Sequence, residues 1–217
     1  MVNKKLQTIA DLIPDSRYLV DVGCDHGYLG IYALLNNKVD YVLNLDINAE
    51  PLEQARRNFQ KYNLLNQASF VLNDGLKNQK FDKQTTVAIA GMGANLIIKV
   101  LEQQTAYADA YILSANSDVI FLRTYLYEHN YLLVNEEIVY EKGNYYFVFL
   151  AKHLNKKTDY HKKDYYISRS LYTRNDRVYR TYLQARYDYL SQLDIAKVSQ
   201  HLRDEYQYLK GVILNER

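Results

Sequence analysis

The stretch from Tyr18 to Gly27, YLVDVGCDHG, is a short apolar run that ends in an acidic residue and leads into a glycine-containing loop. Such a run is typical of a buried strand, and glycine allows a tight turn that a ligand can approach closely. We expect a helix at Leu29–Leu35, whose unpaired N–H groups would face the same loop. This strand–turn–helix unit is typical of nucleotide-binding α/β domains, although glycine spacing alone also fits a simple tight turn.

Strand and helix patterns alternate along the first 130 residues. Short apolar runs predict four further strands, and apolar residues at helical spacing predict the helices around them. This alternation is typical of a parallel sheet with helices on both faces. The expected strands are Tyr41–Asp46, Ala68–Leu72, Thr86–Ala90 and Ala110–Leu113, and the expected helices cover residues 6–13, 50–62, 96–101 and 119–127.

The pattern changes after residue 130. Two extended segments, Tyr131–Glu141 and Tyr145–His153, flank Lys142-Gly143-Asn144, which is typical of a β-hairpin. A dehydrogenase-type Rossmann fold would instead continue with another strand–helix unit. The order of elements therefore predicts an α/β protein with the Rossmann-like fold of class I methyltransferases, in which the sheet is mixed and has seven strands.

Beyond residue 153, apolar residues recur every three or four positions in two stripes. The first stripe runs from Leu171 to Leu193 and the second from Ile195 to Ile213. They predict two helices that pair as an antiparallel helical hairpin, or short coiled coil, with residues 152–163 as the linker. We therefore expect a cofactor-binding domain at 1–155 and a basic helical-hairpin domain at 156–217.

Charge divides the chain in the same place. The 217 residues carry a net charge of +2, but residues 152–217 hold 14 basic and 8 acidic side chains, a net charge of +6. A basic segment attached to an acidic body favours a polyanionic partner such as a nucleic acid, although a well-solvated helix surface would have the same composition. The candidate RNA-binding cations are Lys156, Lys157, Lys162, Lys163, Arg169, Arg174, Arg177 and Arg180.

Composition excludes several classes of protein. An apolar fraction of 48% excludes intrinsic disorder of the chain as a whole. The longest uncharged stretch lies between Lys83 and Lys99, and its 15 residues are too few to cross a bilayer. Asp11 interrupts the apolar core that a signal peptide would need, and a lone Cys24 permits neither an internal disulfide nor a cysteine metal cluster. We expect a cytoplasmic protein without a metal or a membrane anchor. A monomer is favoured, although the hairpin could also be a dimerisation arm.

Three acidic strand ends in succession indicate a ligand site. Asp21, Asp46 and the segment 73–75 (Asn-Asp-Gly) each follow or end an expected strand, and the carboxyl ends of parallel strands meet at the edge where open α/β sheets bind ligands. A helix cap or a turn is the alternative role for any one of them. Asp25 would repel the pyrophosphate of a dinucleotide but suits a ligand with a sulfonium and an ammonium group. Asp46, 23 residues after Gly23, has a spacing near that of ribose-binding carboxylates.

This acidic pattern favours S-adenosylmethionine over a dinucleotide as the cofactor. Its expected binding residues lie in the loops after the first four strands. They are Asp21, Gly23, Cys24, Asp25, Gly27, Asp46, Ile47, Asn73, Asp74, Gly75, Ala90, Gly91 and Met92.

Several motifs together resemble one known family. Asp21–Gly30 (DVGCDHGYLG), Asn73–Gly75 (NDG), Ile89–Gly93 (IAGMG) and the terminal helical stripes are similar to bacterial tRNA (adenine-22, N1)-methyltransferases, the TrmK family, over essentially the whole chain. Two positions depart from the family pattern. Ala94 stands where a second glycine is expected, and residues 114–116 read Ser-Ala-Asn where the family has Gln-Pro-Asn.

The resemblance implies transfer of the sulfonium methyl group to N1 of adenine-22 in the D-arm of tRNA. It also implies that Asp25, His26 and Asn116 act near the reacting atoms, and that Tyr28 meets the RNA by stacking on the target base. Each residue has an alternative role. Asp25 could bind only the cofactor, His26 could cap a helix, Tyr28 could pack under its helix, and Asn116 could merely close a turn.

Other functions fit parts of the same sequence. An enzyme that methylates another RNA position would have the same cofactor site and the same catalytic residues. A non-catalytic RNA-binding protein with this fold would not need the acidic strand ends. Methylation of a small metabolite would leave the basic hairpin without a purpose.

Overall fold

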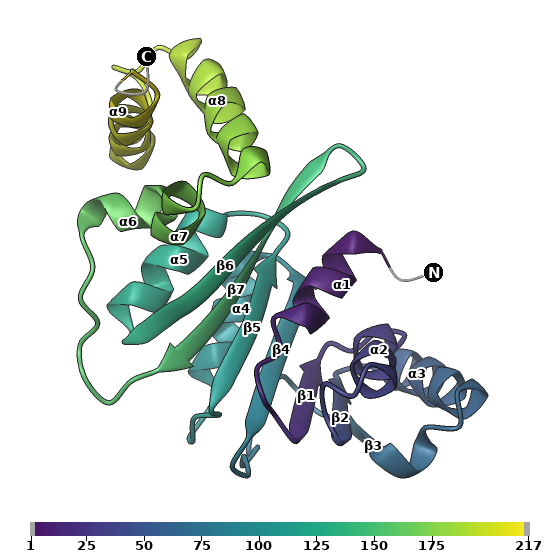
Figure 1. Ribbon diagram of the computed structural model, residues 1–217. Helices are drawn as coiled ribbons and strands as arrows, with labels where there is room; N and C mark the ends of the chain where they lie inside the picture. The colour runs from purple at the N-terminus through teal and green to yellow at the C-terminus, as the bar shows by residue number, and fades with distance from the viewer. Residues whose placement is uncertain (1–2, 215–217) are drawn as a thin grey trace.

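Seven strands form one mixed sheet in the order β3-β2-β1-β4-β5-β7-β6 in the computed structural model, which describes residues 3–214 (Figure 1). The first five strands run parallel, and β7 runs antiparallel to both of its neighbours. This order confirms the methyltransferase-type fold predicted from the sequence. The strands are β1 (Tyr18–Val22), β2 (Tyr41–Asp46), β3 (Ala68–Leu72), β4 (Thr85–Met92), β5 (Ala110–Ala115), β6 (Tyr131–Glu141) and β7 (Asn144–His153).

Helices cover both faces of the sheet. Alternate side chains of each strand point to opposite faces, so both faces carry apolar side chains that the helices bury. In β4, Val87 and Ile89 belong to one buried apolar cluster and Ala88 belongs to another. The first cluster includes residues of α4 (Ala94–Glu102) and α5 (Val119–Glu128). The second includes residues of three helices, which are α1 (Lys4–Asp11), α2 (Tyr28–Leu35) and α3 (Ala49–Lys61). A short 3-10 helix, η1 (Leu65–Gln67), precedes β3.

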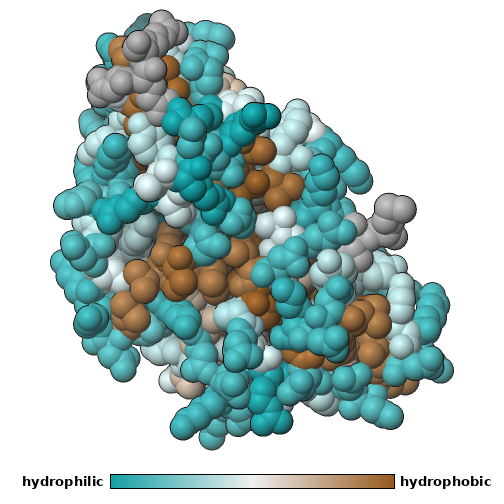
Figure 2. All heavy atoms as spheres, in the orientation of Figure 1, coloured by the Kyte–Doolittle hydropathy of each residue, from teal (hydrophilic) through white to brown (hydrophobic). Residues whose placement is uncertain are grey.

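The β6–β7 hairpin turns tightly, as the sequence predicts. Lys142 and Gly143 have φ angles of 50° and 83°, the left-handed conformations that a two-residue hairpin turn requires. The outer strand, β6, has exposed apolar side chains, since Leu132 and Val134 are 44% and 47% exposed. Figure 2 shows apolar atoms gathered in a band across the middle of the view, where Figure 1 draws α5 and the strands beside it.

The first C-terminal helix is not continuous, so the prediction of one helix from Leu171 to Leu193 is wrong. It is broken into α7 (Arg169–Thr173) and α8 (Arg177–Ser191), and a short α6 (Lys162–Tyr166) precedes them. Asn175 has a left-handed φ of 58°, and the Asp176 side chain accepts a hydrogen bond from the Tyr179 backbone N–H at 2.9 Å, which starts a new helix. Apolar periodicity does not reveal this break, because the stripe continues across it.

The antiparallel hairpin itself is present and consists of α8 and α9 (Gln200–Leu214), drawn at the top of Figure 1. Arg186 of α8 donates two hydrogen bonds, of 2.7 and 2.9 Å, to the buried Glu205 carboxylate of α9. The second helix begins at Gln200 rather than at Ile195, and Lys152 lies in β7 rather than in the expected linker.

The division into domains at residues 155 and 156 stays a prediction. That boundary falls in the loop between β7 and α6. The helices beyond it share one apolar cluster with α4, α5 and the sheet, through buried side chains such as Tyr166, Leu171 and Tyr179. Packing is therefore continuous across the boundary.

A buried ion pair fastens the C-terminal segment to the sheet. Arg123 of α5 donates to Glu136 of β6 at 2.9 Å and to the backbone oxygen of Tyr165 at 3.1 Å, and the side chains of the ion pair are only 2% and 4% exposed. Removing one partner leaves the other charge buried without compensation.

We predict that Arg123→Met lowers the free energy of unfolding by about 3–5 kcal/mol, because Glu136 then stays buried without its partner. Urea denaturation followed by circular dichroism measures this change. Arg17→Met is the matched control, since it breaks an exposed ion pair with Asp40 and should cost about 1 kcal/mol or less. Equal losses in the two variants would contradict the anchoring role of Arg123.

Candidate active site

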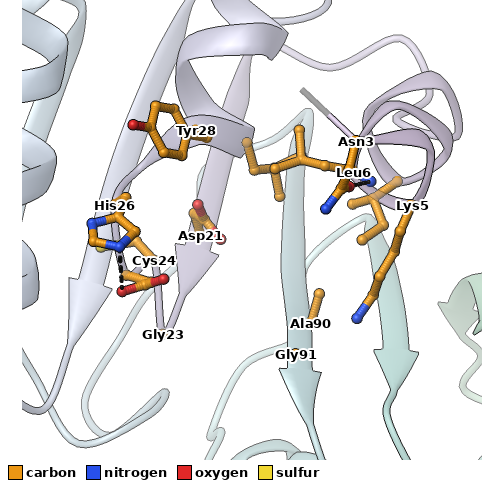
Figure 3. Close-up of a pocket in the computed structure, with 13 residues that line it drawn as sticks. Asn3, Lys5, Leu6, Asp21, Gly23, Cys24, His26, Tyr28, Ala90 and Gly91 are labelled. Carbon is orange, nitrogen blue, oxygen red and sulfur yellow. Dashed lines mark hydrogen bonds and ion pairs between the residues drawn. The ribbon is translucent and has the colours of Figure 1, made fainter. Parts of the chain in front are cut away.

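Two cavities adjoin at the carboxyl edge of the parallel strands. The larger cavity has a volume of about 500 Å³ and the smaller one about 280 Å³. Gly23, Asp25, Ala90 and Gly91 line both, so the loop after β1 and the end of β4 form their shared wall. The larger cavity is further lined by Val22, Asp46, Ile47, Asn48, Asn73, Asp74, Gly75, Met92, Leu96 and Val100. The smaller is further lined by Asn3, Lys5, Leu6, Ile9, Asp21, Cys24, His26, Tyr28 and Leu29 (Figure 3).

The loop between β1 and α2 has an unusual backbone. Gly23, Asp25 and Gly27 all have left-handed φ angles, of 68°, 50° and 69°. The backbone N–H groups of Gly23 and Cys24 both donate to the Leu45 carbonyl, at 2.8 and 3.1 Å, which ties the loop to β2. A side chain at residue 23 would collide with the Met92 methyl group. The glycine is therefore required by conformation and by space together.

Asp46 shapes this loop while facing the larger cavity. One carboxylate oxygen accepts the Asn48 backbone N–H at 3.0 Å, and the other lies 3.4 Å from the Asp25 backbone N–H. Each carboxylate oxygen can accept further hydrogen bonds, so Asp46 can hold the loop and still accept a bond from a ligand hydroxyl.

The loop after β3 is held from α4. Gln103, next after α4, accepts the Leu76 backbone N–H at 2.9 Å and donates to Asp74 at 3.5 Å. Gly75 has a φ of 60°, and a side chain there would collide with the Gln103 amide. Lys77 forms an ion pair with Asp74 at 2.5 Å, and this contact lowers the pKa of the Asp74 carboxyl. Asp74 is thus ionised, and its side chain is held by Lys77 and Gln103 where it lines the larger cavity.

The carboxyl groups of Asp21, Asp25 and Asp46 lie near one another around the shared wall. Asp21 is the most buried of the three. Burial raises its pKa to about 7, and the nearby charges of Asp46 and Asp25 act in the same direction. The same surroundings raise the pKa of the Cys24 thiol, mainly through burial. The thiol therefore stays protonated and is not a nucleophile, whereas Asp21 can gain or lose a proton near neutral pH.

Asp25, His26 and Tyr28 form one side of the smaller cavity. Asp25 Oδ1 and His26 Nε2 are 3.6 Å apart, and the Tyr28 side chain is 45% exposed. Helix α1 forms the opposite side, with Lys5 and Leu6 directed toward the cavity in Figure 3.

Most of the expected cofactor residues come together, with three differences. Asp21 and Cys24 line the smaller cavity rather than the larger one, and Gly27 lines neither. A side chain at Gly27 would meet Phe59 at 2.9 Å and Ala55 at 3.0 Å, so this glycine allows α2 to pack on α3. The other ten residues expected to bind the cofactor line the larger cavity.

Asn116 lies just beyond β5, beside the shared wall. Its amide Nδ2 donates to the Gly91 carbonyl at 2.7 Å, and its Oδ1 accepts a hydrogen bond from the Lys5 ammonium at 2.8 Å. Sequence reasoning missed Lys5 and the rest of the α1 wall, as well as Asn48, Leu96 and Val100. Asn48 could have been found from its place two residues after Asp46, but no spacing connects α1 with the loops of the sheet.

Several of the expected RNA-binding cations pair within the protein. Lys162 contacts Asp204 at 2.7 Å, Arg169 contacts Asp164 at 2.9 Å, and Arg174 contacts Glu137 at 2.5 Å. The other five divide into two groups. Lys163 and Arg180 lie over the Tyr172 ring, at 5.6 and 5.9 Å from its centre, although Lys163 is also exposed. Lys156, Lys157 and Arg177 are exposed. An RNA-binding role for this surface stays a prediction.

Within residues 3–214, no three His, Cys, Asp or Glu side chains are grouped as a metal site would require. No helix in the described part of the chain combines the length and apolar character needed to span a membrane.

The strand order and the acidic edge place the chain among Rossmann-like class I methyltransferases. A family model described as tRNA (adenine(22)-N(1))-methyltransferase, TrmK, matches residues 19–216. The chain therefore belongs to the TrmK family, as the sequence motifs predict.

Individual relatives agree with this assignment. The tRNA (adenine(22)-N(1))-methyltransferase of Bacillus subtilis is 34% identical over 154 residues, which cover 70% of this chain but only 65% of that protein, less than two thirds of its length. The solved structure of M. capricolum TrmK with S-adenosyl-homocysteine has a TM-score of 0.81 at 26% identity, and the match covers 98% of both chains. A putative Streptococcus pneumoniae tRNA (m1A22) methyltransferase, in complex with S-adenosyl-L-methionine, has a TM-score of 0.86 at 25% identity, over 98% of this chain and 100% of that one.

The raised pKa of Asp21 predicts a specific pH dependence of stability. Because the folded state binds this proton more tightly than the unfolded state, Asp21 makes the free energy of unfolding fall as pH rises from about 4 to about 7. Asp21→Asn removes this effect, so the variant should gain on the order of 3 kcal/mol relative to the wild type between these pH values. Urea denaturation at pH 4.5 and 8 measures the gain.

The control is Asp40→Asn, which alters an exposed carboxyl outside both cavities. Parallel pH profiles for the wild type and Asp21→Asn would show that Asp21 titrates normally and that its burial does not raise its pKa.

Proposed function

We propose that this chain transfers the methyl group of S-adenosylmethionine to N1 of adenine-22 in tRNA. The observation that carries the proposal is the pair of adjoining cavities that share Gly23, Asp25, Ala90 and Gly91. A methyl donor in the larger cavity and a base in the smaller one would meet at this wall. Membership of the TrmK family supports the same substrate and the same donor.

The residues of the larger cavity fit this donor. Its volume of about 500 Å³ lies in the range of small-molecule sites. Asp46 offers carboxylate oxygens to ribose hydroxyls, and Asp74 offers one to the adenine amino group. The negative charges suit a ligand with a sulfonium and an ammonium group and would repel a diphosphate. When bound, the donor supplies an electrophilic methyl group on its positively charged sulfur.

Asp21 and Asp25 have different electrostatic roles. A cationic ligand near Asp21 favours its ionised form, so binding lowers a pKa that burial had raised to about 7. Asp25 lines both cavities, which supports a role for its carboxylate near the target base, which becomes positively charged as the methyl group is transferred. There it stabilises the transition state electrostatically. His26 Nε2 lies 3.6 Å from this carboxylate.

The reaction demands alignment more than proton transfer. Unprotonated adenine N1 is already a nucleophile at neutral pH, so holding it in line with the methyl group supplies much of the acceleration. N1 also lies on the pairing edge of the base. The nucleotide must therefore leave its stack, at a cost of a few kcal/mol that contacts elsewhere offset. Tyr28 lines the smaller cavity and is half-exposed, which supports a role in stacking on the extracted base.

The segment 156–217 is the proposed tRNA-binding part of the chain. Exposed cations there contact phosphates and fix the register of the tRNA. The proposed setting is the cytoplasm and the proposed active unit is a monomer, with no metal required.

Activity is tested with purified protein, S-adenosylmethionine and two tRNA transcripts that carry adenine or guanine at position 22. We expect a reverse-transcription stop at position 22 only on the adenine transcript. Asp46→Ala should weaken donor binding at least about 10-fold, because it removes a charge-assisted acceptor, and Asp40→Ala is the control. A stop at another nucleotide would favour methylation of another RNA position, and donor binding without any stop would contradict tRNA as the substrate.

The basic segment is tested with the double variant Lys157→Glu, Arg177→Glu, since both side chains are exposed. It should weaken tRNA binding and lower the slope of log K against log salt by about 1 for each phosphate that is no longer neutralised. Donor affinity should not change. Lys61→Glu, an exposed change on α3, is the matched control, and an unchanged salt slope in the double variant would contradict the proposed surface.

A further inference from the structure

Lys5 connects α1 with the shared wall of the two cavities. Its ammonium donates to Asn116 Oδ1 at 2.8 Å, and Asn116 Nδ2 donates to the Gly91 carbonyl at 2.7 Å. Figure 3 shows Lys5 reaching from α1 toward Ala90 and Gly91, across the cavity from His26 and Tyr28. A chain of two hydrogen bonds therefore runs from the N-terminal helix to the wall where the methyl group would pass.

These two bonds fix which way the Asn116 amide points. An ammonium can only donate a hydrogen bond and a backbone carbonyl can only accept one. A flipped amide would place NH2 against the Lys5 ammonium and oxygen against the Gly91 carbonyl. The Asn116 backbone is also held, since its N–H donates to the Met92 carbonyl at 2.8 Å. The amide oxygen is thus held on the side of Lys5, whose side chain lines the smaller cavity.

Lys5 is itself held in place. Its ammonium lies 4.6 Å from the centre of the Tyr146 ring, and burial lowers its pKa, partly offset by the charge of Glu141. The Lys4 backbone N–H donates to Glu141 Oε1 at 3.1 Å, which fixes the start of α1 on the β6–β7 hairpin. The position of the ammonium is therefore set by several contacts, unlike that of a mobile surface lysine.

We propose that Lys5 is a positioning residue that makes the smaller cavity selective for adenine, by presenting Asn116 Oδ1 as an acceptor for the 6-amino group. This inference rests on the proposed function. Adenine carries a donor amino group next to N1, whereas guanine carries an acceptor oxygen there. The amide oxygen keeps a second lone pair besides the one that Lys5 uses. Asn116 is bonded to Gly91 of the shared wall and to Lys5 of the smaller cavity, so we expect its oxygen to be within reach of a base that enters there.

Loss of the Lys5 ammonium should leave the Asn116 amide held only by its bond to the Gly91 carbonyl. Asn116 Oδ1 would then be oriented less firmly as an acceptor for the adenine amino group. We expect Lys5→Met to lower kcat/KM for the adenine transcript by about 10-fold, the worth of one hydrogen bond to a correctly oriented group. Lys5→Arg, which keeps a charged donor, should recover part of the loss. Affinity for S-adenosylmethionine should stay unchanged in both variants and would show that they fold.

The deciding experiment combines enzyme variants with a change in the substrate. The wild type, Lys5→Met and Asn116→Ala are each assayed on tRNA with adenine or purine riboside at position 22, which lacks only the 6-amino group. Purine riboside also changes the reactivity of N1, but this intrinsic effect is the same for every enzyme and cancels in the comparison. The control is Lys4→Met, because that side chain is exposed on the same helix.

We expect the wild type and Lys4→Met to lose about 10-fold more kcat/KM on purine riboside than Lys5→Met and Asn116→Ala do. Equal losses in all four proteins would overturn the role of Lys5 and leave the methyltransferase assignment intact. A wild type that binds tRNA but methylates neither transcript would overturn the proposed function, and the role of Lys5 with it.

Discussion

The site depends on the burial of Asp21 beside two other carboxyl groups. Asp46 and Asp25 both raise the pKa of Asp21, and burial raises it most. Such a cluster is unfavourable without a cation, because like charges in a poorly solvated site repel each other. Hydrogen bonds of the backbone hold these carboxyl groups together, because N–H groups of the loop after β1 donate to the Leu45 carbonyl and to the Asp46 carboxylate. The repulsion is thus kept at the place where a cationic ligand would relieve it.

The order of strands and the acidic edge could be predicted from the sequence, because both depend on local patterns. Asp21, Asp46 and Asp74 each end or follow a short apolar run, and parallel strands bring such positions to one edge. The hairpin turn at Lys142-Gly143 could be predicted equally well, since left-handed turn positions have a strong residue preference. Local chemistry therefore specifies most of the larger cavity.

Features that depend on tertiary contacts were not predictable in the same way. The break at Asn175 lies within an unbroken apolar stripe, and the left-handed backbone of Asn175 and the Asp176 cap separate α7 from α8. Arg174 is part of the basic segment by composition, yet it pairs with Glu137 of β6. Lys5 lies 111 positions from Asn116 in the chain, so no sequence spacing indicates their contact. Long-range pairings of this kind determine the smaller cavity and the charge that the basic surface presents.

If Asp21 keeps a proton that a cationic methyl donor displaces, binding must release that proton to the solvent. Calorimetric titration with S-adenosylmethionine at pH 7, in two buffers of different ionisation enthalpy, measures the protons released. We expect the wild type to release about half a proton per site, because a group with a pKa near 7 is half protonated at that pH, and Asp21→Asn to release less. Equal proton release by the two proteins would contradict the displacement of a proton from Asp21.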